Sequence, residues 1–214
     1  KNLNSNSLIA YDLNDKKIVW SFQETAHDLW DFDLSAPPIL GDINYKDNLL
    51  KVVIITAKTG NTFVFERNSG KSLFDINYKI APKSNIPGEF TSKYQIYNTL
   101  PERFSRTEFK LEDLRKRFLD NEKFLEEFKK KNIWGWFEPP TLGKELVLNG
   151  IHGGSNWFGS SFDQKNKIIY IPSSNIPFKI EIYLKSIKQI EEKSFPENLK
   201  KVYQFYNNNC STCH

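Results

Sequence analysis

The stretch "HDLWDFD" at residues 27–33 carries the densest group of side chains that could do chemistry. It places three carboxylates, an imidazole and an indole within seven positions, between two strand-like runs. Such a group could hold a general base beside a cofactor, because a carboxylate near a cation stays ionised and can accept a proton. It could equally be a solvated turn, where Asp side chains commonly hydrogen-bond the local backbone. Composition alone does not choose between its carboxylates, Asp28, Asp31 and Asp33.

A second candidate site is "CSTCH" at residues 210–214. Its two thiols, Cys210 and Cys213, can form thioethers with the two vinyl groups of one haem, and the adjacent His214 then ligates the iron. A dithiol redox pair usually lies in a βαβ context, and a zinc site needs a second pair of ligands; the sequence shows neither. The motif therefore predicts a c-type haem. Because such haem is attached outside the bacterial cytoplasmic membrane, we expect a periplasmic or otherwise exported protein, with membrane association left open.

The composition is that of a folded protein and argues against nucleic acid as a partner. Of 214 residues, 39% are hydrophobic and 14% aromatic, and the net charge of +4 comes from 30 basic and 26 acidic residues scattered along the chain. A phosphate-binding face usually needs clustered Lys and Arg, which this sequence lacks. No apolar run approaches the roughly 18 residues that cross a bilayer. Because Met is absent, even at position 1, and the chain stops within a motif, we expect an internal fragment of a longer protein.

An internal repeat indicates which elements position these residues. Residues 10–20, "AYDLNDKKIVW", read as a strand that ends in an acid, a polar turn and a second strand that ends in an aromatic ring. Residues 64–74, "VFERNSGKSLF", follow the same plan, with Glu66 in the place of Asp12 and a ring at the end. A weaker third copy lies at residues 161–171, "SFDQKNKIIYI". Repeated strand pairs with a docking ring favour an all-β propeller over a sandwich or a barrel.

Two segments depart from the strand pattern. Residues 108–131 space Leu and Phe along one helical face with charges on the other, which predicts a helical excursion from a propeller loop. From Ser194 the chain reads "SFPE", a capping-box spacing with Pro196 in the first turn, so a helix is expected to lead into the cysteines. The predicted organisation is a partial propeller over residues 1–180, followed over residues 181–214 by a linker and the first helix of a cytochrome c domain.

Several motifs, taken in order, resemble the quinoprotein dehydrogenases of the glucose and alcohol type. They are "HDLWDFDLSAPP" from residue 27, "AKTGNTFVFERNSGK" from residue 57 and "GGSNWFGSSFD" from residue 153, within a likeness that extends from about Asn6 to Pro177. Members of this family use pyrroloquinoline quinone (PQQ) and fold as eight-bladed β-propellers. The resemblance implies that this all-β chain forms part of such a propeller, with PQQ and calcium as cofactors.

The resemblance assigns roles to three residues. Asp31, the second Asp of the HDxWD motif, would be the general base for the substrate hydroxyl and would approach calcium. Lys58, in "AKTG", would contact the quinone oxygens, and Asn156, before Trp in "GGSNW", would lie beside PQQ. The chemistry agrees, because hydride removal from an alcohol carbon needs a base for the hydroxyl proton, and a cationic donor stabilises negative charge on an oxygen.

These roles imply an oxidoreductase that oxidises a sugar or alcohol hydroxyl through PQQ. Its electrons would pass to the covalent haem and then to a downstream cytochrome or quinone, while further calcium ligands and the ring that stacks on PQQ would lie before Lys1. Two other interpretations stay open: a non-catalytic β-propeller scaffold, and an electron-transfer protein with a degenerate dehydrogenase domain. The scaffold predicts none of these motifs, and intact Asp31 and Lys58 count against the degenerate enzyme.

Overall fold

The computed structural model describes residues 2–152 and 154–183, together with the helical positions Val202, Phe205 and Asn208. The chain divides into two compact units, Lys1–Ile182 and Tyr183–His214. The first unit contains the acid-rich segment and the repeat copies. The predicted helix from Ser194 and the CSTCH motif lie outside the described residues, apart from the three isolated positions just named.

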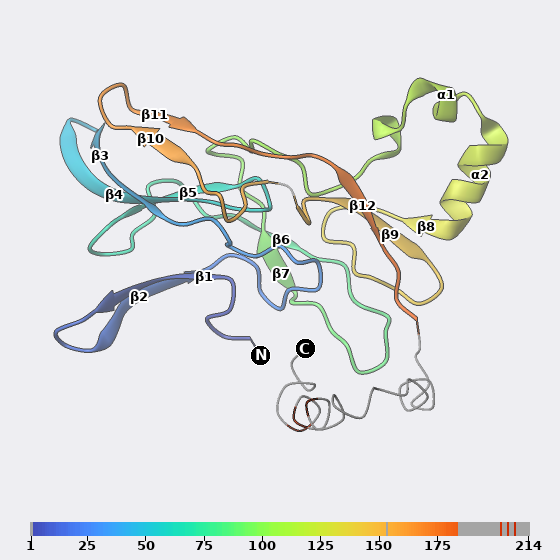
Figure 1. The fold of residues 1–214 in the computed structure, drawn as a ribbon, viewed down its shortest axis with the longest axis horizontal. Coiled ribbons are helices and arrows are strands. Elements are labelled where there is room, and N and C mark those ends of the chain that lie inside the picture. The colour runs from blue at the N-terminus through green and yellow to red at the C-terminus, as the bar shows by residue number, and fades with distance from the viewer. Residues whose placement is uncertain (1, 153, 184–201, 203–204, 206–207, 209–214) are drawn as a thin grey trace. The chain divides into compact units, whose positions relative to one another are not determined.

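Short antiparallel strands dominate the first unit (Figure 1). One hairpin pairs β1 (Ser7–Asp12) with β2 (Lys17–Gln23), and β3 (Ile39–Tyr45), β4 (Asn48–Thr56) and β5 (Thr62–Glu66) form a meander. Further pairs are β6 (Tyr78–Ile80) with β7 (Tyr94–Ile96) and β10 (Ser161–Asp163) with β11 (Ile168–Tyr170). The remaining sheet has the order β12 (Pro177–Ile180), β9 (Glu145–Asn149), β8 (Asn132–Ile133), and β8 runs parallel to β9. The predicted all-β character is confirmed.

The three repeat copies close their turns with the same contact. Asp12, Glu66 and Asp163 each accept hydrogen bonds from the backbone N–H groups two and three residues further on, at 2.7–3.1 Å. The fourth residue after each acid has a positive φ, and this residue is Lys16 (φ +52°) in the first copy and Gly70 (φ +69°) in the second. Since only Gly adopts this conformation without steric cost, the first turn keeps its shape against the preference of its Lys.

Trp20, the ring that ends the first copy, docks on the turn of the second copy. Its indole Nε1 donates a hydrogen bond to the backbone carbonyl of Arg67 at 3.0 Å, and its ring centroid lies 5.8 Å from that of Phe65. The ring also covers Gly70, where an added Cβ would come within 2.5 Å of it. Burying a large ring between successive copies ties one strand group to the next, as the repeat predicted.

The predicted helical excursion consists of short pieces in place of one continuous helix. They are a 3-10 turn η1 (Leu111–Asp113), α1 (Lys116–Leu119) and α2 (Glu122–Lys131). Asn121 caps α2 by accepting a hydrogen bond from the Phe124 N–H at 3.0 Å. Phe128 is the buried residue of α2 and packs in a small cluster with Phe109 and Val147. Helix α2 leads directly into β8 (Figure 1). The excursion is thus anchored on β9 by aromatic packing.

Candidate active site

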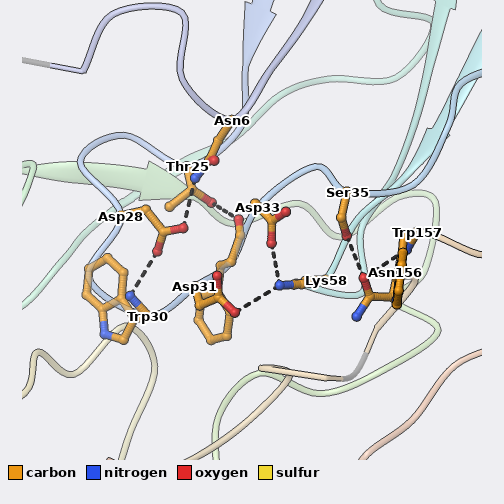
Figure 2. A network of polar contacts seen from close by, with 11 residues as sticks. Asn6, Thr25, Asp28, Trp30, Asp31, Asp33, Ser35, Lys58, Asn156 and Trp157 are labelled. Atoms are coloured by element: carbon orange, nitrogen blue, oxygen red, sulfur yellow. Dashed lines mark hydrogen bonds and ion pairs between the residues drawn. The ribbon is translucent and has the colours of Figure 1, made fainter. Parts of the chain in front are cut away.

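Lys58 and the acid segment, residues 27–33, come together in the structure (Figure 2). Lys58 lies in the turn between β4 and β5, whereas the acid segment follows β2. The Lys58 Nζ donates a hydrogen bond to Asp31 Oδ2 at 3.0 Å and forms an ion pair with Asp33 Oδ1. Two residues that the family resemblance selected independently, Asp31 and Lys58, are therefore direct neighbours, and Asp33 is a second partner of the ammonium.

The ion pairs keep Lys58 charged although it is buried. Lys58 is only 6% exposed, and burial by itself lowers the pKa of its ammonium, but the hydrogen bonds and charges of Asp33 and Asp31 outweigh burial and raise that pKa above its ordinary value. The side chain of Asp31 is 64% exposed, against 36% for Asp33. The site thus combines a buried cation, Lys58, with a solvent-accessible carboxylate, Asp31.

The backbone of the acid segment is held by its buried neighbours. Trp30 is 1% exposed, and its indole Nε1 donates a hydrogen bond to the Glu138 carbonyl at 2.7 Å. The Asp28 carboxylate accepts from the Trp30 N–H at 2.9 Å and from the Asn6 side-chain amide at 2.8 Å. Asp31 itself has φ +62°, a left-handed conformation that Asp tolerates better than most residues. Asp28 is thus engaged in the scaffold, while Asp31 is free to face solvent and Lys58.

The turn at residues 57–61, called the Lys58 turn below, is held by neighbouring segments. Within it, the Gly60 N–H donates to the Ala57 carbonyl at 3.0 Å, and Gly60 has φ +79°. The Phe104 N–H donates to the Gly60 carbonyl at 3.1 Å, and the Ser155 N–H donates to the Ala57 carbonyl at 3.1 Å. Because these supports come from distant parts of the sequence, the Lys58 turn is fixed by tertiary contacts and not by its own hairpin alone.

Asn156 contacts Ser35, two residues after the acid segment, and the preceding residue, Ser155, is bonded to the Lys58 turn. Its side-chain oxygen accepts hydrogen bonds from the Ser35 hydroxyl at 3.0 Å and from the Trp157 N–H at 2.8 Å (Figure 2). Among the residues that the structure describes, no hydrogen bond joins Asn156 to Asp31 or Lys58. The amide nitrogen of Asn156 is therefore the group that could donate to a ligand.

Two buried polar residues near the site were not selected from the sequence. Gln95, in β7, is 1% exposed and brackets the backbone of Ala26: its amide nitrogen donates to the Ala26 carbonyl at 2.7 Å, and its oxygen accepts from the Ala26 N–H at 3.1 Å. Glu24 is 3% exposed and contacts the Lys58 turn. In the sequence, Gln95 could be noticed as a polar residue within an apolar strand. No feature of the sequence marks Glu24 as part of the site.

The described residues accommodate part of the expected cofactor set. A buried ammonium such as that of Lys58 suits an oxygen that gains negative charge, as a quinone oxygen does when the quinone is reduced. Calcium takes about six to eight oxygen ligands, whereas residues 2–152 and 154–183 contain no group of three His, Cys, Asp or Glu side chains that could hold a metal ion. Asp31 could supply one carboxylate to such an ion. Cys210, Cys213 and His214 lie outside the described residues, so the haem site stays a prediction.

Comparison with known proteins places this geometry in a family. Residues 1–212 match the model described as "Glucose/ethanol/alcohol dehydrogenase, beta-propeller domain", a PQQ family. Quinoprotein glucose dehydrogenase A of Acinetobacter calcoaceticus is 31% identical over 183 residues, which cover 81% of this chain and 22% of that protein. The quinohemoprotein alcohol dehydrogenase of Comamonas testosteroni is 25% identical over 180 residues, which cover 84% of this chain and 20% of that protein.

The fold comparison agrees. The solved structure of quinohemoprotein alcohol dehydrogenase ADHIIG from Pseudomonas putida HK5 aligns with 86% of this chain and 22% of that chain, with a TM-score of 0.50 and 17% identity. That likeness concerns the fold alone. The chain spans about a fifth of the length of the curated relatives it matches, and these relatives are named as sugar and alcohol dehydrogenases. The chain therefore forms part of a β-propeller and belongs to the PQQ-dependent glucose/ethanol/alcohol dehydrogenase family.

Proposed function

We propose that this chain carries the base and the quinone-facing cation of a PQQ-dependent dehydrogenase that oxidises a sugar or alcohol hydroxyl. The observation that carries the proposal is the buried Lys58 ammonium held between Asp31 and Asp33, within the motifs of the family. The names of the relatives, quinoprotein glucose dehydrogenase and quinohemoprotein alcohol dehydrogenase, support a CH–OH substrate. Among the acids of the segment, the greater exposure of Asp31 supports its assignment as the base.

Asp31 would take the hydroxyl proton of the substrate at its carboxylate. Bound PQQ would supply the acceptor for two electrons. A general base must lie within hydrogen-bond reach of the proton that it removes, and a positioned base of this kind contributes about 10²- to 10⁴-fold to a rate. The exposed carboxylate of Asp31 can meet a substrate from solvent, while the hydrogen bond that it accepts from Lys58 orients it.

Lys58 would stabilise negative charge on a neighbouring oxygen, and the state of Asp31 regulates how strongly it does so. With Asp31 and Asp33 both ionised, the Lys58 charge is compensated by two carboxylates. When Asp31 accepts a proton, one of these charges is neutralised, so the ammonium acts more strongly on the next nearest negative group. Because Lys58 is buried, its field is weakly screened by water. Proton uptake and charge stabilisation are thereby coupled through one ion pair.

The electrons would then pass to a c-type haem bound through Cys210, Cys213 and His214, and from there to a cytochrome or quinone. The CSTCH motif and the name of the quinohemoprotein relative support this step. The same motif supports a periplasmic or otherwise exported location and the assignment of residues 181–214 to a linker and the start of a cytochrome domain. In the described part of the chain, no helix has the length and apolar character needed to cross a membrane.

The test is reconstitution of the full-length protein with PQQ and calcium. We expect PQQ to bind and aldoses or primary and secondary alcohols to be oxidised with an artificial electron acceptor. Oxidation should reduce the haem, which its absorbance reports directly. A protein that binds PQQ but oxidises none of these substrates would contradict the proposal, and a protein without covalent haem would remove the electron-transfer step alone.

A further inference from the structure

A buried carboxyl group joins the root of the acid segment to the Lys58 turn. Glu24 directly follows β2 and precedes Asp31 by seven residues. Its Oε1 accepts a hydrogen bond from the Thr59 hydroxyl and a second one from the Asn61 side-chain amide at 3.3 Å. Asn61 also donates to the Thr59 hydroxyl at 3.0 Å, so the three side chains form a closed network. Both Thr59 and Asn61 are 1% exposed, and the contact is therefore shielded from water.

Glu24 is also linked to the acid segment, through Asn6. Its N–H donates to the Asn6 carbonyl at 3.1 Å, and the Asn6 side chain in turn holds Asp28 at 2.8 Å. Apart from the contacts of Lys58 itself, the side-chain hydrogen bonds that join the Lys58 turn to residues 24–33 in the described structure all go to Glu24. The other supports of the turn lead to different segments. Glu24 is thus the second link between the cation and the acids.

The charge state of Glu24 suits this position. Burial raises its pKa to about 8, against the hydrogen bonds from Thr59 and Asn61 and the charge of Arg103, which lower it, while the charge of Asp28 raises it further. At neutral pH the group is therefore mostly a neutral acid. Ionisation above pH 8 would place a poorly screened negative charge beside the turn, near the charged groups that act on Glu24, Arg103 and Asp28.

We propose that Glu24 is a positioning residue for the Lys58–Asp31 pair, whose side chain fixes the Lys58 turn against the acid segment. The inference rests on the function proposed above for Lys58 and Asp31. If the turn moved away, Lys58 would lose the alignment of its ammonium with Asp31 and with any ligand oxygen. A displacement of about 1 Å in such a site can cost on the order of 100-fold in rate. The effect should be measurable in the affinity for PQQ, because binding of PQQ depends on the position of Lys58 but does not require turnover.

The experiment compares two substitutions of Glu24 in the full-length protein. Glu24→Gln keeps the size and the accepting oxygen but cannot ionise, whereas Glu24→Ala removes the link. We expect Glu24→Ala to weaken PQQ affinity at pH 7 at least tenfold in a fluorescence titration, and Glu24→Gln to bind within about threefold of wild type. Wild-type affinity should fall as pH rises through about 8, and this fall should be absent in Glu24→Gln. Glu145→Gln, which changes an ion pair with Lys179 between β9 and β12, is the control for a Glu-to-Gln substitution away from the site.

The outcomes separate the two proposals. If wild type binds PQQ and turns over while Glu24→Ala binds equally well, the positioning role is overturned and the proposed function stands. The same holds if Glu24→Gln shows the wild-type fall of affinity above pH 8. If Glu24→Ala does not fold, as judged by circular dichroism, the pH profile of Glu24→Gln decides alone. If wild type neither binds PQQ nor oxidises any substrate, the proposed function fails and the positioning role with it.

Discussion

Gly154 lies directly on the backbone of Lys58. A Cβ added at Gly154 would come within 2.1 Å of the Lys58 carbonyl oxygen, and Gly154 has φ +58°. Its N–H donates a hydrogen bond to the Ser174 carbonyl at 3.1 Å, while the following N–H, of Ser155, donates to the Ala57 carbonyl at 3.1 Å. The "GGSNW" and "AKTGN" motifs therefore approach more closely than any side chain at position 154 would permit.

Gly154→Ala should force the Lys58 turn and the 154–157 segment apart. Gly143→Ala is the matched control, since Gly143 has φ +76° but no atom lies within 4 Å of an added Cβ. Both variants pay the left-handed backbone cost of about 1–2 kcal/mol, so the difference between them reports the clash with Lys58. We expect Gly154→Ala to unfold at lower urea than Gly143→Ala and to bind PQQ at least tenfold more weakly. Equal stability and affinity of the two variants would contradict the contact.

Asp31→Asn should abolish most of the turnover and little else. The amide keeps the shape and can still accept a hydrogen bond from Lys58, but it cannot take up a proton. We expect turnover to fall about 10²- to 10⁴-fold, with haem absorbance unchanged and PQQ affinity nearly so, as measured by steady-state assay and titration. Asp15→Asn, at an exposed turn where Asp15 pairs with Lys17, should leave all three properties unchanged. Normal turnover in Asp31→Asn would remove Asp31 from the role of base.

Lys58→Met should impair both PQQ binding and the chemical step. Methionine fills nearly the same buried volume without the charge, so Asp31 and Asp33 lose their shared partner. Loss of a preorganised donor to a developing oxyanion costs about 10²- to 10³-fold in rate. Single-turnover haem reduction at saturating PQQ isolates this step from binding. A variant with wild-type rate under those conditions would show that Lys58 serves the fold and not the reaction.

The buried acid Glu24 should give the protein a pH-dependent stability. Its pKa is raised from 4.5 to about 8 in the folded state, so the folded protein binds the proton more tightly than the unfolded chain does. The stabilisation is fully present below pH 4.5 and is lost as pH rises to about 8, at a slope of at most about 1.4 kcal/mol per pH unit. Urea unfolding between pH 5 and 8.5 measures it. Glu24→Gln should remove this slope, and an identical slope in the variant would assign it to another group.

Trp20→Ala should destabilise the propeller through loss of the docking ring. The substitution removes the packing on Phe65 and Gly70 and the hydrogen bond to Arg67. Since Trp20 is half-buried, we expect the free energy of unfolding to fall by about 2–3 kcal/mol, somewhat less than for a fully buried Trp. Trp157→Ala is the control, because Trp157 is 80% exposed and a surface substitution changes stability by about 0.5 kcal/mol or less. Equal effects of the two substitutions would argue against docking.

Features of this protein that depend on local spacing can be predicted from the amino-acid sequence. An acid four residues before a residue with positive φ closes each repeat turn, as at Asp12 and Glu66, and a ring at a fixed offset marks the docking position of Trp20. The turn and the position of its ring lie within a dozen residues of chain, so local spacing marks them, although the contact of Trp20 with Arg67 is itself tertiary. The family motifs around Asp31 and Lys58 are of the same kind, because each is a contiguous string.

The assembly of the site depends on long-range packing and could not be predicted from local spacing. Asp33 as a partner of Lys58, Glu24 beneath Thr59 and Gly154 on the Lys58 backbone join residues that are 25 to 96 positions apart. No periodicity marks such residues, since their roles arise from which strands the fold brings side by side and which polar groups it buries. Burial also decided the chemistry: the same carboxyl group that would be ionised on the surface is a neutral acid at Glu24, because the packed turn excludes water from it.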